Sequence, residues 1–144
     1  MSNVVACPSC GKKNRVPAAA GGIARCGACH VPLPWLTTAG DDDFEEVAVQ
    51  SPVPVLVDLW APWCGPCRAV APGVEQAARS LAGRLKVVKV NVDEAPRVSA
   101  RFEARSIPLL LLLDRGTVVD RQVGALPPEA LVRWVEEAVR RQAA

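Results

Sequence analysis

Aromatic side chains are scarce in this sequence of 144 residues, which contains no tyrosine and only two phenylalanines. Half of the residues are hydrophobic and 22% are charged, a balance typical of a soluble globular protein. The core therefore has to be built mainly from valine, leucine, alanine and the four tryptophans. The length suits one ordinary domain with a small appendage.

Long hydrophobic runs are also lacking. The apolar run Ile107–Leu113 is seven residues long, whereas a membrane-spanning helix needs about 20. The N-terminus lacks the charged segment and the following apolar segment of a secretory signal peptide. We therefore expect a cytoplasmic protein with no membrane partner. In a reducing compartment, cysteines favour metal binding or catalysis over stable disulfides.

The formal net charge of +2 is too small to suggest a polyanionic partner. The charges are unevenly distributed, because residues 1–40 contain four basic side chains and no acidic one. This asymmetry indicates a boundary after a basic N-terminal segment. The basic residues of that segment are not interleaved with aromatic side chains that could stack on bases, so we expect no nucleic-acid partner.

Four of the six cysteines form two C-x2-C pairs separated by 15 residues, namely Cys7, Cys10, Cys26 and Cys29. This spacing is typical of a structural zinc site with four thiolate ligands. A segment so short buries too little apolar surface to fold alone, and zinc binding would supply the missing free energy. We predict one structural zinc ion per chain and no organic cofactor, with a redox-active dithiol pair as the alternative. His30 is a further possible ligand, although we expect it at the surface.

The stretch Val53–Cys67 combines a nearly continuous apolar run with the remaining two cysteines. The run predicts a strand buried on both faces, and it contains one acid, Asp58. Cys64-Gly65-Pro66-Cys67 follows where a helix can begin. The unpaired N–H groups and the dipole of a helix N-terminus stabilise a thiolate, and a thiolate attacks disulfides. The pattern therefore predicts a redox site, with a structural disulfide or half of a zinc site as alternatives.

The block V-D-L-W-A-P-W-C-G-P-C resembles the thioredoxin family nearly residue for residue. The resemblance implies an α/β thioredoxin fold, a central mixed β-sheet flanked by helices, over residues 37–144. Residues 1–36 would form a small zinc-ribbon-like module in front of it. Within the family, this module is similar to that of the second, zinc-ribbon-bearing thioredoxin of bacteria.

The periodicity of the sequence predicts the same order of elements. We expect an acidic helix or loop from Asp41 and a kink at Pro72 in the helix after the cysteines. The expected strands are a short one around 35–37, then Val53–Trp60, Val88–Val92, Leu109–Leu113 and Thr117–Val123; the expected helices are one from the cysteines to Gly83, then Pro96–Phe102 and Pro128–Arg140.

The resemblance also assigns roles to the residues around the cysteines. It implies that Cys64 is the exposed nucleophile and Cys67 the buried resolving thiol. Asp58 would assist proton transfer at Cys67, with Lys89 as its neighbour, although a purely structural role for Asp58 remains open. We expect burial to raise the pKa of Asp58.

Substrate contacts are implied for six residues: Trp63, Gly65, Pro66, Ile107, Pro108 and Gly124. Ile107-Pro108 matches the cis-proline loop of the family, but the sequence alone does not show a cis peptide bond. Leu109 stands where the family usually has threonine, a departure that bears on substrate preference or on the entry into the strand.

The leading hypothesis is a thiol-disulfide oxidoreductase that reduces protein disulfides through a mixed disulfide. Its partners would be disulfide-containing proteins and a thioredoxin reductase, and we expect a monomer. The alternative is a redox sensor or holdase that loses zinc when the N-terminal cysteines are oxidised. A nucleic-acid-binding ribbon is a third and weaker hypothesis.

Overall fold

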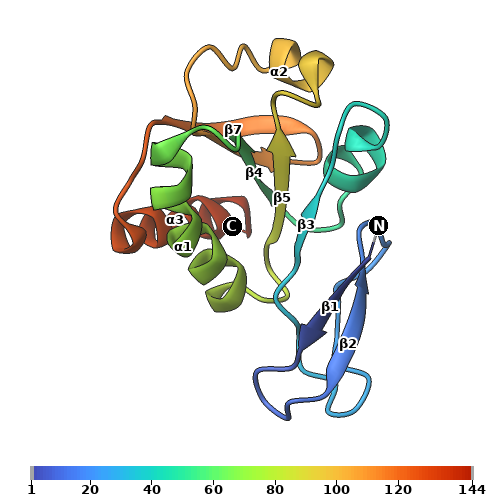
Figure 1. Cartoon of the computed structure of the whole chain (residues 1–144). Helices are drawn as coiled ribbons and strands as arrows, with labels where there is room; N and C mark the ends of the chain where they lie inside the picture. Colours follow the sequence, from blue (N-terminus) through green and yellow to red (C-terminus); the bar gives the residue numbers. More distant parts are fainter. Residues whose placement is uncertain (1, 144) are drawn as a thin grey trace.

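The computed structural model describes residues 2–143, which form two β-sheets. The larger sheet has five strands in the order β3-β5-β4-β6-β7 (Figure 1). Strands β3, β4 and β5 are parallel, whereas β6 is antiparallel to β4 and β7 is antiparallel to β6. The strands span Leu36–Thr38 (β3), Val55–Trp60 (β4), Lys86–Asn91 (β5), Leu109–Asp114 (β6) and Thr117–Val123 (β7). The predicted mixed sheet is confirmed.

The central strands β4 and β6 are hydrophobic on both faces because both faces are covered. Val55, Val57 and Leu59 of β4 pack into a cluster on one face, while Leu56 packs into a second cluster on the other. The five leucines of β6 divide in the same alternating way, and each is fully buried. β5 begins at Lys86, two residues before the predicted strand, because Lys86 and Val87 already pair with β4.

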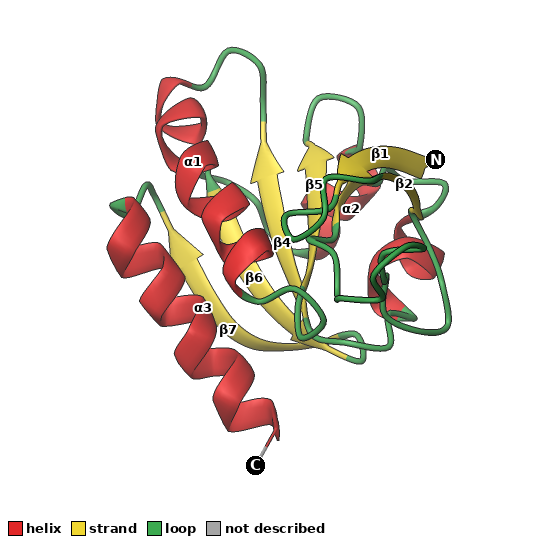
Figure 2. Ribbon diagram, turned by 90° about the horizontal axis from the view of Figure 1, so that it is seen from below, coloured by secondary structure: helices red, strands yellow, loops and turns green. Residues whose placement is uncertain are grey.

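Helices α1 (Gly65–Ser80) and α3 (Pro128–Ala143) lie side by side along one face of the sheet (Figure 2). A Cβ atom on Gly73 of α1 would lie 3.0 Å from Cα of Pro128, so this position needs glycine for the close approach. Pro72 lies inside α1, which continues through it to Ser80. None of the helices found within residues 2–143 is long and apolar enough to cross a membrane.

The other face of the sheet is covered by two short helices, η1 (Glu45–Val49, a π-helix) and α2 (Pro96–Arg101). The rings of Phe44 and Phe102 meet there edge to face, with centroids 5.5 Å apart. The helix expected from Asp41 is thus confined to its second half, and the three aspartates form the turn before it.

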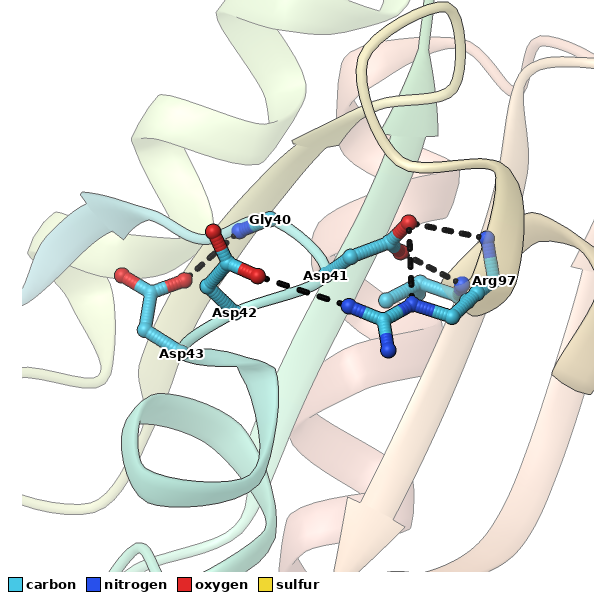
Figure 3. Close-up of polar contacts among 6 residues, drawn as sticks. Gly40, Asp41, Asp42, Asp43 and Arg97 are labelled. Atoms are coloured by element: carbon cyan, nitrogen blue, oxygen red, sulfur yellow. Dashed lines mark hydrogen bonds and ion pairs between the residues drawn. The ribbon is translucent and has the colours of Figure 1, made fainter.

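Asp41 does not cap the helix that follows it in the chain. Its carboxylate accepts hydrogen bonds from the backbone N–H groups of Arg97 (3.0 Å) and Val98 (2.9 Å) at the start of α2 (Figure 3). Burial would raise the pKa of Asp41, but these N–H groups and the guanidinium of Arg97 lower it below its usual value. Asp43 instead accepts a bond from the N–H of Gly40. The acidic turn that follows β3 is therefore held against the start of α2 by hydrogen bonds.

The smaller sheet pairs β1 (Ser2–Ala6) with β2 (Lys13–Pro17) in antiparallel register. We call residues 2–33 the cysteine module. Its apolar cluster includes Cys7, Cys26 and Leu33, and it extends to Trp35 and Val53, which lie just before β3 and β4. The module (blue in Figure 1) therefore lies at the end of the large sheet opposite to the start of α1.

Candidate functional site

Cys64 and Cys67 are joined by a disulfide at the N-terminus of α1. Cys64 is the N-cap residue of the helix, with extended backbone angles, and its Sγ accepts a hydrogen bond of 3.2 Å from the backbone N–H of Cys67. Sγ of Cys64 also lies 3.8 Å from the carbonyl oxygen of Ile107. A sulfur that accepts an N–H bond at a helix N-terminus is placed to carry negative charge when the disulfide is reduced.

The two cysteines are equally buried in this oxidised form, since each is 4% exposed. The predicted greater exposure of Cys64 is therefore wrong at the level of the whole residue. Its physical reason is the cover around the disulfide, where Ala61, Trp60 and Ile107 pack against both cysteines. What distinguishes them is the donated N–H bond, which only Cys64 accepts among the described contacts.

The predicted substrate-contact residues surround this disulfide. Trp63 is 67% exposed, and its Nε1 donates a hydrogen bond of 3.0 Å to Asp93. The peptide bond between Ile107 and Pro108 is cis, as the family resemblance implied. The carbonyl oxygen of Pro108 accepts a 2.9 Å bond from the N–H of Gly124, a residue with φ of +90°. Gly65 and Pro66 form the exposed first turn of α1.

Asp58 lies in β4 and is 1% exposed. Burial raises the pKa of its carboxyl group to about 6, and the charge of Lys89 opposes this shift. Within residues 2–143, Oδ1 of Asp58 has no hydrogen-bond partner. The expectation of a raised pKa is confirmed, and an unpaired buried carboxylate is typical of functional sites.

Lys89 is the direct neighbour of Asp58 in the parallel ladder of β4 and β5. Its Nζ lies 5.3 Å from the centroid of the Trp60 ring, so its ammonium group is held over an aromatic face. A cavity of about 710 Å³ is lined by Lys89 and Trp60 and also by the acidic turn at Asp41. Trp60 and Lys89 are therefore partly open to solvent, whereas Asp58 is buried.

The four remaining cysteines converge at the other end of the sheet. Their sulfur atoms all lie within 4.8 Å of one another, and the pairs Cys7–Cys29 and Cys10–Cys26 are 3.6 Å apart. Four thiolates around a tetrahedral zinc ion stand about 3.8 Å apart, given Zn–S bonds of about 2.3 Å. The donor set and its spacing therefore fit a Zn(Cys)4 centre, and His30 is exposed and lies outside the group.

Hydrogen bonds favour the thiolate of Cys26, but not that of Cys10. A backbone hydrogen bond from Lys12 lowers the pKa of Cys10, but the side chains of Cys26 and Cys29 raise it to about 11. The backbone N–H groups of Cys29 and Ala28 lower the pKa of Cys26 to about 5. Asn14 adds a contact from Nδ2 to Cys26 Sγ at 3.5 Å, and its Oδ1 accepts a bond from the N–H of Gly27. Metal ligands are commonly held by such outer contacts.

Comparison with known proteins gives a consistent answer. The family model described as Thioredoxin matches residues 35–137. Thioredoxin of Haemophilus influenzae is 48% identical over 69% of this chain and 92% of its own length. Thioredoxin 1 of Nostoc sp. is 50% identical over 67% of this chain and 91% of its own.

The chain belongs to the thioredoxin family. A further relative, thioredoxin C-3 of Corynebacterium nephridii, is 38% identical over 96% of this chain and 97% of its own length, so the similarity extends into the N-terminal residues. As a thioredoxin-family protein, this chain is a thiol-disulfide oxidoreductase that acts as a protein-disulfide reductase.

The side chain of Leu109, where this chain departs from the family pattern, lies in the core. Leu109 is fully buried and packs into the core cluster with Val57 and Val90, while Pro108 precedes it in the loop beside the disulfide. Its side chain therefore fills the core at the entry into β6. Asp93 is a site residue that the sequence did not reveal, because its contact with Trp63 joins positions 30 residues apart.

Proposed function

We propose that this thioredoxin reduces protein disulfides with Cys64 as the nucleophile and Cys67 as the resolving thiol. The observation that carries the proposal is the N–H bond from Cys67 to Sγ of Cys64 at the start of α1. In the reduced protein, the thiolate of Cys64 attacks a substrate disulfide and releases one substrate thiolate. Cys67 then attacks Sγ of Cys64 in the mixed disulfide and releases the second substrate thiolate. Two electrons and two protons pass to the substrate, and the disulfide of the protein is restored.

Asp58 serves the second step in this scheme. Cys67 must lose its proton before it attacks, and a carboxylate with a pKa near 6 accepts a proton more readily than one with an ordinary pKa. Lys89 keeps part of the Asp58 population ionised, because its positive charge opposes the effect of burial.

The groups that meet a substrate are the exposed ring of Trp63, the turn of Gly65 and Pro66, and the loop of Ile107 and Pro108. Gly124 fixes this loop through its bond to the carbonyl of Pro108. An extended peptide that lies across the loop brings its disulfide to Cys64. The oxidised protein would be returned to the dithiol by a thioredoxin reductase.

The cysteine module is proposed to hold one structural zinc ion through Cys7, Cys10, Cys26 and Cys29. The support is the spacing of the four sulfurs and the N–H bonds to Cys26. When bound, the zinc supplies folding free energy and no redox chemistry. The division of the chain at residues 36 and 37, a monomeric state and a cytoplasmic location belong to the same proposal.

A second candidate function is a redox sensor or holdase that releases zinc on oxidation. The exposure of Cys10 favours it, since an exposed sulfur is open to oxidants. The two functions are separated by a disulfide-reduction assay. The proposed enzyme reduces insulin disulfides with dithiothreitol as electron donor, and Cys64→Ser loses this activity, whereas a sensor alone would show no turnover.

A further inference from the structure

Lys86 is a buried cation that forms no ion pair with any residue in the range 2–143. It is the first residue of β5 and is 0% exposed. Lysine is almost never fully buried unless it is paired. Among the residues that the structure describes, no carboxylate forms an ion pair with it. A residue so unusual needs an explanation from its surroundings.

The ammonium group joins three segments that are distant in the sequence. Its Nζ donates hydrogen bonds to the carbonyl oxygens of Ala18, just after β2, and of Val47, in η1. It also lies 4.3 Å from the centroid of the Trp35 ring, just before β3. The two carbonyls and the aromatic face take the place of a counter-ion.

Two further bonds tie the same region together. Nε1 of Trp35 donates a 2.9 Å bond to the carbonyl of Pro17, next to the Ala18 carbonyl that Lys86 holds. Nδ2 of Asn3, in β1, donates a 2.6 Å bond to the carbonyl of Leu36. Trp35 packs into the apolar cluster of the cysteine module with Cys7 and Cys26. The module is thus attached by its backbone carbonyls and by one ring.

We propose that Lys86 is a positioning residue that docks the cysteine module on the thioredoxin fold, so that the folded module and the edge formed by β3 and β5 stabilise each other. This proposal goes beyond the redox chemistry of Cys64. Of the two measurements described below, only the loss of zinc to a chelator rests on the proposed zinc site. Lys86 begins β5, the strand that also carries Lys89, the neighbour of Asp58.

The electrostatics agree with this role. Burial lowers the pKa of Lys86 to about 8, and the charge of Glu46 opposes this shift. At pH 7 the side chain is therefore still mainly an ammonium group with three N–H donors. When the module undocks, Lys86 loses its hydrogen bond to the Ala18 carbonyl, and Trp35 loses its contact with the module. The Val47 carbonyl and the Trp35 ring stay beside Lys86, so undocking leaves this buried charge with one hydrogen-bond acceptor fewer.

The test compares amide hydrogen exchange in Lys86→Met, Lys86→Arg and the wild type, with Lys13→Met as a control at an exposed lysine. Lys86→Met removes the charge and the donors while keeping the length of the side chain. Its amides in β1, β2 and β3 should exchange about tenfold faster, the factor expected from losing hydrogen bonds to a charged group. Those in β6 and α3 should be unchanged, and Lys86→Arg and Lys13→Met should resemble the wild type.

A second readout is zinc loss to a chelator, which should be faster in Lys86→Met and not in Lys13→Met. Trp35→Phe supplies a second variant if Lys86→Met does not fold, since it removes the bond to Pro17, shrinks the ring that faces Lys86 and should accelerate exchange in β1 and β2. Unchanged exchange in β1 to β3, equal acceleration throughout the chain, or an equal effect of Lys86→Arg would overturn the proposal. If the wild type failed to reduce disulfides, the proposed function would be contradicted. The hydrogen-exchange test of Lys86 would not be affected by that result.

Discussion

Asp58 of β4, which is buried, lies opposite Lys89 of β5 in the parallel ladder, and Lys89 lines a cavity. The two residues act on each other through charge, because Lys89 lowers the pKa that burial raises. Asp58 lies on the strand that leads directly to the redox cysteines. This placement gives a carboxylate that changes its charge near pH 6, close to the thiol chemistry.

Replacing Asp58 by asparagine should stabilise the protein at neutral pH. In the folded protein the pKa of Asp58 is about 6, above the ordinary value of 3.8. Ionisation of the buried carboxylate therefore destabilises the fold, and the stability falls as the pH rises from about 4 to 6. The gain at pH 7.5 is at most about 3 kcal/mol, and it disappears below pH 3.8. Urea unfolding at pH 7.5 and pH 3.5 measures it, and an equal effect at both values would contradict the raised pKa.

Removal of the same carboxylate should slow one half-reaction more than the other. In Asp58→Ala, attack by Cys64 on a substrate disulfide should be nearly unchanged, while resolution by Cys67 should be slower by about 100-fold, the lower end of the range for general bases. In the wild type, the rate of resolution should rise through a pKa near 6 as Asp58 ionises. Rapid-mixing kinetics separate the two steps, and equal slowing of both would indicate that Asp58 is only structural.

The metal and the redox disulfide should be separable. Cys26→Ser removes one of four sulfurs that lie within 4.8 Å of one another, so the purified protein should lose its zinc. Disulfide reductase activity should largely survive, because the cysteine module lies at the opposite end of the sheet from Cys64 (Figure 1).

The matched control for this variant is Ser9→Ala, an exposed non-ligand between Cys7 and Cys10. It should retain one zinc ion per chain in metal analysis. Activity that disappears together with the metal in Cys26→Ser would show that the two parts of the chain do not act separately.

Most of the elements could be predicted because their signals are local. The apolar run before Cys64 predicts β4, the alternation around Val88 predicts β5, and the C-x2-C spacing predicts that four sulfurs converge. The acidic turn was placed less well, because the carboxylate of Asp41 caps α2 from more than 50 residues away. No local pattern encodes such a contact.

The same limit explains the site residues that the sequence did not reveal. Asp93 holds the ring of Trp63, and Lys86 holds the carbonyl of Ala18, through contacts that only the folded chain creates. In the sequence, Lys86 looks like an ordinary charged residue before a strand. The equal burial of Cys64 and Cys67 likewise depends on how Ile107 packs over the disulfide.

The roles of the two redox cysteines are tested most directly by trapping mixed disulfides. Cys67→Ser lacks the resolving thiol, so after incubation with cell extract it should accumulate covalent complexes on non-reducing gels. Cys64→Ser should accumulate few, because only Sγ of Cys64 accepts the N–H bond at the start of α1 among the described contacts. Mass spectrometry of the trapped bands would identify the substrates. Equal trapping by both variants, or trapping by Cys64→Ser alone, would contradict the assignment of Cys64 as the nucleophile.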